Sequence, residues 1–314
     1  MRDVIVIGGG LSGLLAAYML RQRGLSATLI EVKAELGGSL RTVRQAGFTI
    51  DSVVFATWGD LPEPLLADLG LADALFPLND QVSAFKDGAG QLVAALAARL
   101  ATSPLTRMAA SSIGALENGR MGVCLENGLL LDARRVIVAV PARYAARLFA
   151  TSAPEVTAQL LDYHYDTVQR ISLGYPAEAL DSVQPRFFSD PSYVYRYETR
   201  HPSRVPEGHA LLQLALRVSP QHATPAQLVE HAIANIGYPS DPLVQVVGYW
   251  AEADPLSCYD DAHPLRMQTI AAHLPPGVAL IGSDYALNPS RRPGVVALAE
   301  RVEQARQAVE RVLA

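Results

Sequence analysis

The chain has 314 residues, of which 50% are hydrophobic and 18% are charged, and its formal net charge is −5. This length allows two domain cores. A nucleic-acid-binding surface needs clustered basic residues, and the only lysines are Lys33 and Lys86, so we expect no nucleic-acid partner. Cys124 and Cys258 form no metal-ligand spacing. We therefore expect no metal site and two reduced thiols.

The N-terminal stretch from Val4 to Leu20 is apolar enough to suggest a signal peptide or a membrane span. It contains several glycines, however, and it has neither a basic n-region nor a cleavage site. It is also short for a membrane-spanning helix. We therefore expect a soluble, cytoplasmic protein with no integral membrane segment.

The first forty residues predict a dinucleotide-binding βαβ unit. A β-branched strand over 4–7 precedes Gly8-Gly9-Gly10-Leu11-Ser12-Gly13, which satisfies G-x-G-x-x-G. A helix over 14–23 follows and is closed by Gly24. A second strand over 27–30 ends at Glu31. The strand, the helix and the acid in this order are the context that makes the glycine motif specific.

Each part of this unit has a mechanical role. Gly8 permits a tight turn, Gly10 lets the backbone approach a pyrophosphate, and Gly13 brings the helix close to the strand. The helix N-terminus at Leu11 and Ser12 offers unpaired N–H groups to phosphates. Glu31, at the end of the second strand, can accept hydrogen bonds from ribose hydroxyls and would repel a 2′-phosphate, and we expect Val32 beside it to contact the cofactor as well.

The next segment distinguishes FAD from NAD. It runs Gly37-Gly38-Ser39-Leu40-Arg41-Thr42 and then Gly47-Phe48-Thr49-Ile50-Asp51. This resembles the amine oxidase and protoporphyrinogen oxidase superfamily of flavoproteins, in which a G-G-[RK]-x-x-[ST] loop and a G-[FY]-x-x-D strand follow the acid. The resemblance implies FAD as the cofactor, with Gly37, Gly38, Ser39 and Arg41 along its pyrophosphate and ribityl chain. The alternative is a loop and hairpin in an NAD enzyme.

A second block, from Asp87 to Pro141, resembles another part of the same superfamily. It predicts a helix up to Leu100, then strands punctuated by Asn-Gly pairs, and it ends in Ala139-Val140-Pro141. The resemblance implies that Ala139 lies near the cofactor. It also implies that Ile113 holds the adenine through its backbone, although without the family these are simply core strands.

The third block begins at Gly282-Ser283-Asp284, which resembles the superfamily's A-G-[DE] motif. The resemblance implies that Gly282 and Asp284 hold phosphate or ribityl oxygens. A helix is expected from about Val295 to Leu313, and the resemblance implies that its positive end points at the flavin pyrimidine ring.

The fold implied is α/β: a Rossmann-like FAD-binding domain with a parallel sheet, of the two-dinucleotide-binding-domain flavoprotein type, plus a smaller, mostly antiparallel substrate domain. We expect the FAD-binding domain to be discontinuous, over 1–58, 82–150 and 265–314. The substrate domain then covers 151–264, and 59–81 is a short remnant of the family's helical lobe. In size the chain resembles the compact, renalase-like members.

Candidate substrate-pocket residues are fewer and less specific. Tyr195 belongs to an alternating tyrosine stretch that lines either a pocket or the sheet core. Tyr249 and Trp250 occupy a position that the family places near the flavin, and Trp58 is a further candidate. His263 is either a proton carrier near neutral pH or a structural histidine. We assign no catalytic side chain, because the flavin would carry the chemistry.

Several family positions differ in this chain. Ser39 replaces a basic residue, Ser52-Val53-Val54 replaces a glycine pair beside the isoalloxazine, and Ser283 replaces a glycine. Ala297-Leu298 replaces a Gly-Ala pair, and neither lysine lies where many amine oxidases have one near the flavin N5. These differences affect the redox end of the site more than the adenosine end.

The sequence therefore predicts an FAD-dependent oxidoreductase that removes a hydride from a C–H or C–N bond of a small, largely apolar substrate. Oxygen or another acceptor would reoxidise the flavin. One alternative is a degenerate relative that acts as an accessory or scaffold for a protein partner. The other, suggested by size, is a renalase-like enzyme that oxidises reduced nicotinamides.

Overall fold

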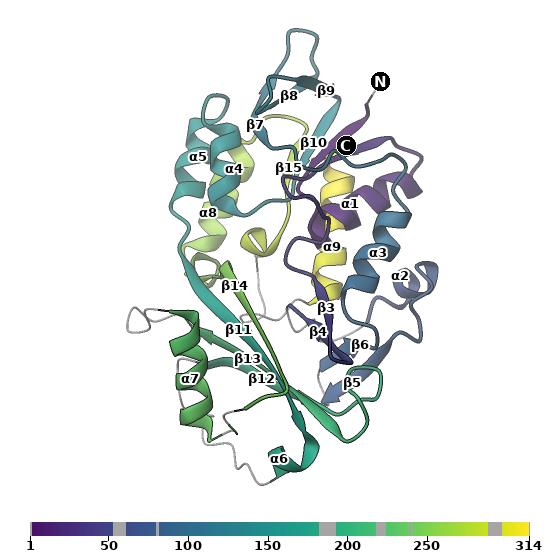
Figure 1. Cartoon of the computed structure of the whole chain (residues 1–314). Coiled ribbons are helices and arrows are strands. Elements are labelled where there is room, and N and C mark those ends of the chain that lie inside the picture. Colours follow the sequence, from purple (N-terminus) through teal and green to yellow (C-terminus); the bar gives the residue numbers. More distant parts are fainter. Residues whose placement is uncertain are drawn as a thin grey trace.

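The computed structural model describes residues 2–52, 61–79, 82–181, 193–217, 224–237, 239, 241–287 and 297–313 (Figure 1). Of the residues singled out above, Val53, Val54, Trp58 and Val295 lie outside these ranges.

A parallel sheet with the strand order β15-β10-β1-β2 forms one end of the molecule. Its strands are β1 (Val4–Ile7), β2 (Ala27–Ile30), β10 (Arg135–Val138) and β15 (Val278–Leu280). The short apolar runs are typical of parallel strands covered on both faces. Accordingly, Val6 packs into one core cluster while Ile5 and Ile7 pack into another.

Helices cover the first face of this sheet, and a mixed layer covers the second. On the first face lie α1 (Leu11–Gln22), α2 (Glu63–Asp68), α3 (Gly90–Ala98) and α9 (Leu298–Leu313). On the second lie α4 (Ala142–Phe149), α5 (Pro154–Leu161), α8 (His263–His273), and the meander β7 (Ala110–Ala115), β8 (Met121–Leu125) and β9 (Leu130–Ala133).

A second, antiparallel sheet with the order β12-β13-β11-β14 lies at the other end (Figure 1). Its strands are β11 (Tyr165–Pro176), β12 (Tyr193–Thr199), β13 (His209–Arg217) and β14 (Val244–Pro255). Helix α7 (Pro225–Ile236) covers one face, where its Val229 and Ile233 share a buried cluster with strand residues such as Ile171 and Leu214. The short helix α6 (Ala177–Asp181) follows β11.

The hairpin of β3 (Thr42–Gln45) and β4 (Phe48–Asp51) lies between the two sheets. Phe48 and Ile50 are buried with Val205 and Leu211 of the antiparallel half. The remaining elements are β5 (Leu75–Asn79), β6 (Val82–Phe85), and the 3₁₀ turns η1 (Leu256–Tyr259) and η2 (Ser283–Tyr285).

The α/β fold class predicted from the sequence is confirmed, with one parallel sheet and antiparallel sheets beside it. The division into domains stays a prediction. In the described ranges, the parallel strands come from 4–30, 135–138 and 278–280, and the large antiparallel sheet comes from 165–255. No helix in those ranges is both long enough and apolar enough to cross a membrane.

Candidate cofactor and substrate site

A cavity of about 1200 Å³ lies between the carboxyl ends of the parallel strands and the antiparallel sheet. It exceeds the roughly 300–1000 Å³ of most small-molecule sites. Its walls include most of the residues that we expected at the cofactor, namely Gly8, Gly10, Leu11, Ser12, Glu31, Val32, Gly37, Gly38, Ser39, Arg41, Ala139, Gly282 and Asp284. Three separate chain segments thus meet at one cavity.

Two glycines of the first motif are required by the protein's own packing. Gly8 has φ = +107°, and a Cβ built there would lie 2.4 Å from the Ala139 carbonyl oxygen. A Cβ on Gly13 would lie 1.9 Å from the Gly8 carbonyl oxygen. Gly13 therefore acts through close contact between α1 and β1, as the motif predicts, and it does not line the cavity.

Gly10 differs from both, because none of the described residues near it requires a glycine there. Its φ is −73°, which any residue adopts. A Cβ added to Gly10 would have the Gly38 Cα as its nearest neighbour, at 3.9 Å. Gly10 also lines the cavity and is the N-cap residue of α1, where it has no side chain to accept a hydrogen bond from the first N–H groups of the helix. The missing side chain leaves room for a ligand against the helix N-terminus, which fits a pyrophosphate.

Glu31 is held by backbone donors at the end of β2. One carboxylate oxygen, Oε2, accepts a hydrogen bond of 2.6 Å from the Gly9 N–H, and Oε1 accepts one of 2.8 Å from the Lys33 N–H. The residue is 6% exposed and lines the cavity. A carboxylate has about four acceptor positions, so this one can also accept hydrogen bonds from ribose hydroxyls.

Ser52, in the place of a family glycine, supports the loop that follows β2. Its hydroxyl donates a hydrogen bond of 2.5 Å to the Ser39 carbonyl and accepts one of 2.8 Å from the Arg41 N–H. Both loop residues line the cavity. The Arg41 side chain lies 3.8 Å from the Glu35 carboxylate, and both are exposed, so this pair contributes little.

Asp284 joins three elements behind the cavity wall. Its carboxylate accepts hydrogen bonds from the Ala142 N–H at the start of α4, at 2.8 Å, and from the Tyr165 hydroxyl of β11. Ser283 donates a third, of 3.1 Å. Burial is the main cause that raises the pKa of Asp284 above its usual range. The serine that replaces the family glycine is thus bonded to the acid of the motif.

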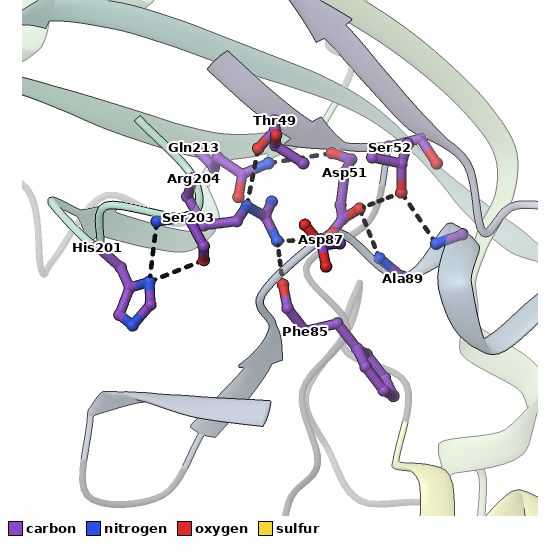
Figure 2. A network of polar contacts seen from close by, with 12 residues as sticks. Thr49, Asp51, Ser52, Phe85, Asp87, Ala89, His201, Ser203, Arg204 and Gln213 are labelled. Atoms are coloured by element: carbon purple, nitrogen blue, oxygen red, sulfur yellow. Dashed lines mark hydrogen bonds and ion pairs between the residues drawn. The ribbon is translucent and has the colours of Figure 1, made fainter. Parts of the chain in front are cut away.

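A buried ion pair, Arg204 with Asp51, fixes the end of β4 (Figure 2). The Arg204 Nη1 lies 2.9 Å from an Asp51 carboxylate oxygen, and it also donates to the Phe85 carbonyl at 2.8 Å. The other oxygen of Asp51 accepts a hydrogen bond of 2.8 Å from the Ala89 N–H. The sequence pattern did not identify Arg204, since an arginine in a connecting segment carries no signal of burial.

The antiparallel sheet forms the roof of the cavity and is bonded to the end of β4. Gln213 of β13 donates a hydrogen bond of 3.0 Å to the Asp51 carbonyl and one of 3.3 Å to the Ser172 hydroxyl (Figure 2 shows the former). Arg170 and Ser172 of β11 line the cavity. The alternation of polar and apolar residues over 170–173 was the signal that could have identified both.

One wall of the cavity is lined by charged and aromatic residues of α4 and β14. Arg143 forms an ion pair with Glu252, and the Tyr144 hydroxyl donates a hydrogen bond of 3.0 Å to the same carboxylate. Tyr249 also lines the cavity and is 65% exposed. Of the predicted substrate-pocket residues, Tyr249 is the one that the structure places on the cavity wall.

Two predicted site residues lie away from the cavity. Ile113 is 2% exposed and packs in the core under the meander, while residues 108–111 of the same segment line the cavity instead. His263 is 1% exposed, and its Nε2 donates a hydrogen bond of 2.9 Å to the Ala286 carbonyl. Burial is the main cause that lowers the pKa of His263. The burial of His263 and its hydrogen bond to Ala286 fit the structural role that the sequence offered for it, and the backbone contact expected for Ile113 stays a prediction.

Some of the remaining predicted site residues lie within the part of the chain that the structure describes, and others lie outside it. Trp58 and Val295 lie outside the described residues, as do the side chains of Tyr195 and Trp250. At the start of α9, Ala297 lines the cavity while Leu298 is fully buried in the core. The described residues contain no group of three or more His, Cys, Asp or Glu that could bind a metal ion.

Comparison with known families finds two matches. Residues 6–66 match the NAD(P)-binding Rossmann-like domain, and residues 54–286 match the flavin containing amine oxidoreductase family. Protoporphyrinogen oxidase 2 of Arabidopsis thaliana is 42% identical over 83 residues, which are 26% of this chain and 16% of that protein. The aligned stretch thus spans a small part of that relative's length.

Solved structures show the same fold over nearly the whole chain. A triple mutant of putrescine oxidase, redesigned at its cofactor site, has a TM-score of 0.75 at 14% identity and covers 99% of this chain and 98% of its own. Reduced UDP-galactopyranose mutase has a TM-score of 0.72 at 15% identity, over 100% of this chain and 94% of its own. Because proteins of such different names share the fold, the fold alone does not identify the reaction.

Proposed function

The chain belongs to the flavin-containing amine oxidoreductase family of FAD-dependent oxidoreductases, and we propose that it removes a hydride from a C–H or C–N bond of a small substrate with a largely apolar body. FAD supplies the hydride acceptor when bound, and oxygen or another acceptor reoxidises it. The protein's own residues bind the cofactor, orient the substrate and exclude water.

Gly10 is the observation that best supports this function. Neither its backbone conformation nor any neighbour in the described part of the chain requires a glycine, yet it lies on the cavity wall at the N-terminus of α1. A site for a phosphate group explains it, because phosphate binds closest where the backbone N–H groups are uncovered. Glu31 at the adjacent strand end supplies the ribose acceptor.

The remaining cofactor contacts follow from the cavity wall. Gly37 and Gly38, with φ of +107° and +61°, bring their loop against Gly10. Arg41 offers positive charge to the pyrophosphate. Gly282 and Asp284 line the wall at the end of β15, next to the start of α9.

The substrate space lies under the antiparallel sheet. Val43, Ile50 and Val246 give it apolar walls, which supports the largely apolar substrate expected from the sequence. The sheet covers this region on one side, and exclusion of water favours a hydride transfer. The proposed reaction therefore takes place between the end of β4 and the roof strands β11 and β14.

The first test is the visible absorption spectrum of the purified protein, before and after dialysis against excess FAD. We expect flavin bands that bleach with dithionite, and anaerobic bleaching by at least one donor in a panel of amines, carboxylic acids with an oxidisable C–H bond, and reduced nicotinamides. Bleaching by reduced nicotinamides alone would favour the renalase-like alternative.

A colourless protein that takes up no FAD, or a holoprotein that no donor reduces, would contradict the proposed enzyme and favour an accessory protein. As a matched control for substitutions of cavity glycines, Gly114→Ala alters a glycine of β7 that does not line the cavity and whose added Cβ would meet no described atom within 4 Å. It should bind FAD as the wild type does, so a loss of flavin in this variant would indicate a folding defect.

A further inference from the structure

The two faces of the antiparallel sheet differ in chemical character. Ile171 and Leu173 of β11 point to the face covered by α7 and are fully buried. Arg170 and Ser172 alternate with them and point to the opposite face, where both line the cavity. A charged residue therefore lies in the roof of a space whose other nearby walls include apolar side chains.

Arg170 lies in a place shaped by small neighbours. The residues paired with it across the sheet are Ala215 of β13 and Gly248 of β14. A Cβ on Gly248 would lie 3.6 Å from both Nε and Nη2 of Arg170, so the guanidinium extends over this glycine. The residue is only 9% exposed. A guanidinium at a buried cavity wall binds an anion strongly, because little water screens the attraction.

Ser172 adds a hydrogen-bond donor on the same face, two residues along β11. Its oxygen accepts the hydrogen bond from Gln213, which leaves the hydroxyl proton to point elsewhere. Val246 pairs with Ser172 across the sheet and also lines the cavity. The roof thus offers a planar cation and a hydroxyl donor beside an apolar wall.

Two carboxylates of the cavity wall are already bound to other arginines. Asp51 pairs with Arg204, and Glu252 pairs with Arg143. The two arginines therefore compensate the negative charges of these carboxylates. An anionic ligand under the roof would accordingly meet compensated carboxylates and the Arg170 guanidinium.

We propose that Arg170 and Ser172 form a subsite for a carboxylate group of the substrate, so that the substrate class is small acids with an apolar body. The planar guanidinium matches a carboxylate with two parallel hydrogen bonds, and Ser172 donates a third. The proposal rests on the proposed oxidoreductase function, and it adds the anionic group that orients the substrate under the roof.

The test compares benzoate with benzamide, which has a similar shape but no charge. Each is titrated into the FAD-loaded protein, and binding is followed by the change in the visible spectrum of the oxidised flavin. We expect benzoate to bind at least about tenfold more tightly than benzamide, as for a charge-assisted contact. In Arg170→Met this preference should vanish while the benzamide affinity stays within about twofold.

Further variants separate charge from folding. Arg170→Lys keeps the charge and should keep part of the preference, and Ser172→Ala should lower it by a few fold. Arg217→Met removes a positive charge on β13 outside the cavity wall and should bind both probes as the wild type does. Flavin content and unfolding midpoints identify any variant that fails to fold. If Arg170→Met is such a variant, Arg170→Gln replaces it.

Equal binding of the two probes by the wild type, no spectral change with either, or a preference that survives in a folded Arg170→Met variant would each overturn the proposal. The titration needs no electron donor. A protein that prefers benzoate but is reduced by no donor would contradict the proposed function alone. One that oxidises a donor without this preference would contradict the subsite alone.

Discussion

Arg204 and Asp51 form an ion pair of 2.9 Å in which both side chains are at least 97% buried. The pair joins the connection before β13 to the last residue of β4, next to the loop that lines the cofactor cavity (Figure 2). The net stabilisation by a buried ion pair is small, because desolvation of the two charges offsets their attraction. Removal of one partner is strongly destabilising, because the other charge then stays buried without a counter-charge.

Replacing Arg204 alone should therefore destabilise the protein strongly. We expect Arg204→Met to lower the free energy of unfolding by about 3–5 kcal/mol, because the Asp51 carboxylate is left buried without its counter-charge. Urea denaturation with the FAD-free protein measures the change. The double variant Arg204→Met/Asp51→Asn should be destabilised by at least about 0.5 kcal/mol less than the sum of the single changes. Strict additivity would mean that the two residues are not coupled.

Gly10 and Gly13 should respond differently to the same substitution. We expect Gly10→Ala to change the free energy of unfolding by no more than about 1 kcal/mol and to weaken FAD binding by at least about tenfold, since its methyl group enters the cavity. Gly13→Ala should cost about 3 kcal/mol or more, because its methyl group would clash with the Gly8 carbonyl.

FAD titrations and urea denaturation of both variants make this comparison. A Gly10→Ala variant with unchanged FAD affinity would remove the main support for the phosphate site. Addition of FAD at 100 times its dissociation constant should stabilise the wild type by about 2.7 kcal/mol. The same FAD concentration should stabilise Gly10→Ala much less.

Ser52 should matter for cofactor affinity, although it stands where the family has glycine. We expect Ser52→Ala to weaken FAD binding by about fivefold to tenfold, because the Ser39–Arg41 loop loses two hydrogen bonds worth about 1 kcal/mol. Ser83→Ala on β6, outside the cavity wall, is the matched control and should bind FAD normally. Equal affinities in the two variants would show that the loop does not depend on Ser52.

His263 should make stability depend on pH. Burial holds its pKa below the ordinary value of about 6.5, so the folded protein keeps the ring neutral. The stability that comes from the neutral ring is therefore fully present above about pH 6.5. It is lost as the pH falls below that value, because the unfolded chain then binds a proton before the folded protein does. The neighbouring charged groups that also act on it are Arg266, Asp260 and Asp284.

The measurement is the free energy of unfolding of the wild type and of His263→Gln between pH 7.5 and pH 5. Glutamine can still donate to the Ala286 carbonyl. We expect the wild type to lose more stability on acidification than the variant does. Parallel pH profiles would show that another group, such as His201, whose pKa burial also lowers, causes the acid sensitivity.

The parts of the site that the sequence predicted are those built from local geometry. Gly8, Gly10, Gly13 and Glu31 lie within one βαβ unit, where strand, turn and helix determine each position within a few residues. The spacing alone predicted the tight turn at Gly8, the close approach of a pyrophosphate to Gly10 and the packing of helix on strand at Gly13. For the same reason, the strands and helices around this motif were predicted close to their observed bounds.

The roof and the buried ion pair depend on long-range packing instead. Arg170 meets the cavity only because β11 is paired between β13 and β14. Arg204 reaches Asp51 across 153 residues of chain. Likewise, the Ile113 side chain packs into the core under the meander, and the contact of its backbone with the adenine stays a prediction. A one-residue change of register decides which face of a strand a side chain takes.

The hydrogen bond between Ala142 and Asp284 spans 142 residues, and β15 pairs with β10 over a similar separation. During synthesis at about 5–20 residues per second, β10 therefore exists for roughly 7–28 s before its neighbour emerges from the ribosome. Throughout that interval its edge carries unpaired backbone groups that can pair with another nascent chain. Newly made chains should thus need protection from aggregation, and the rate of translation between β10 and β15 should influence the yield of folded protein.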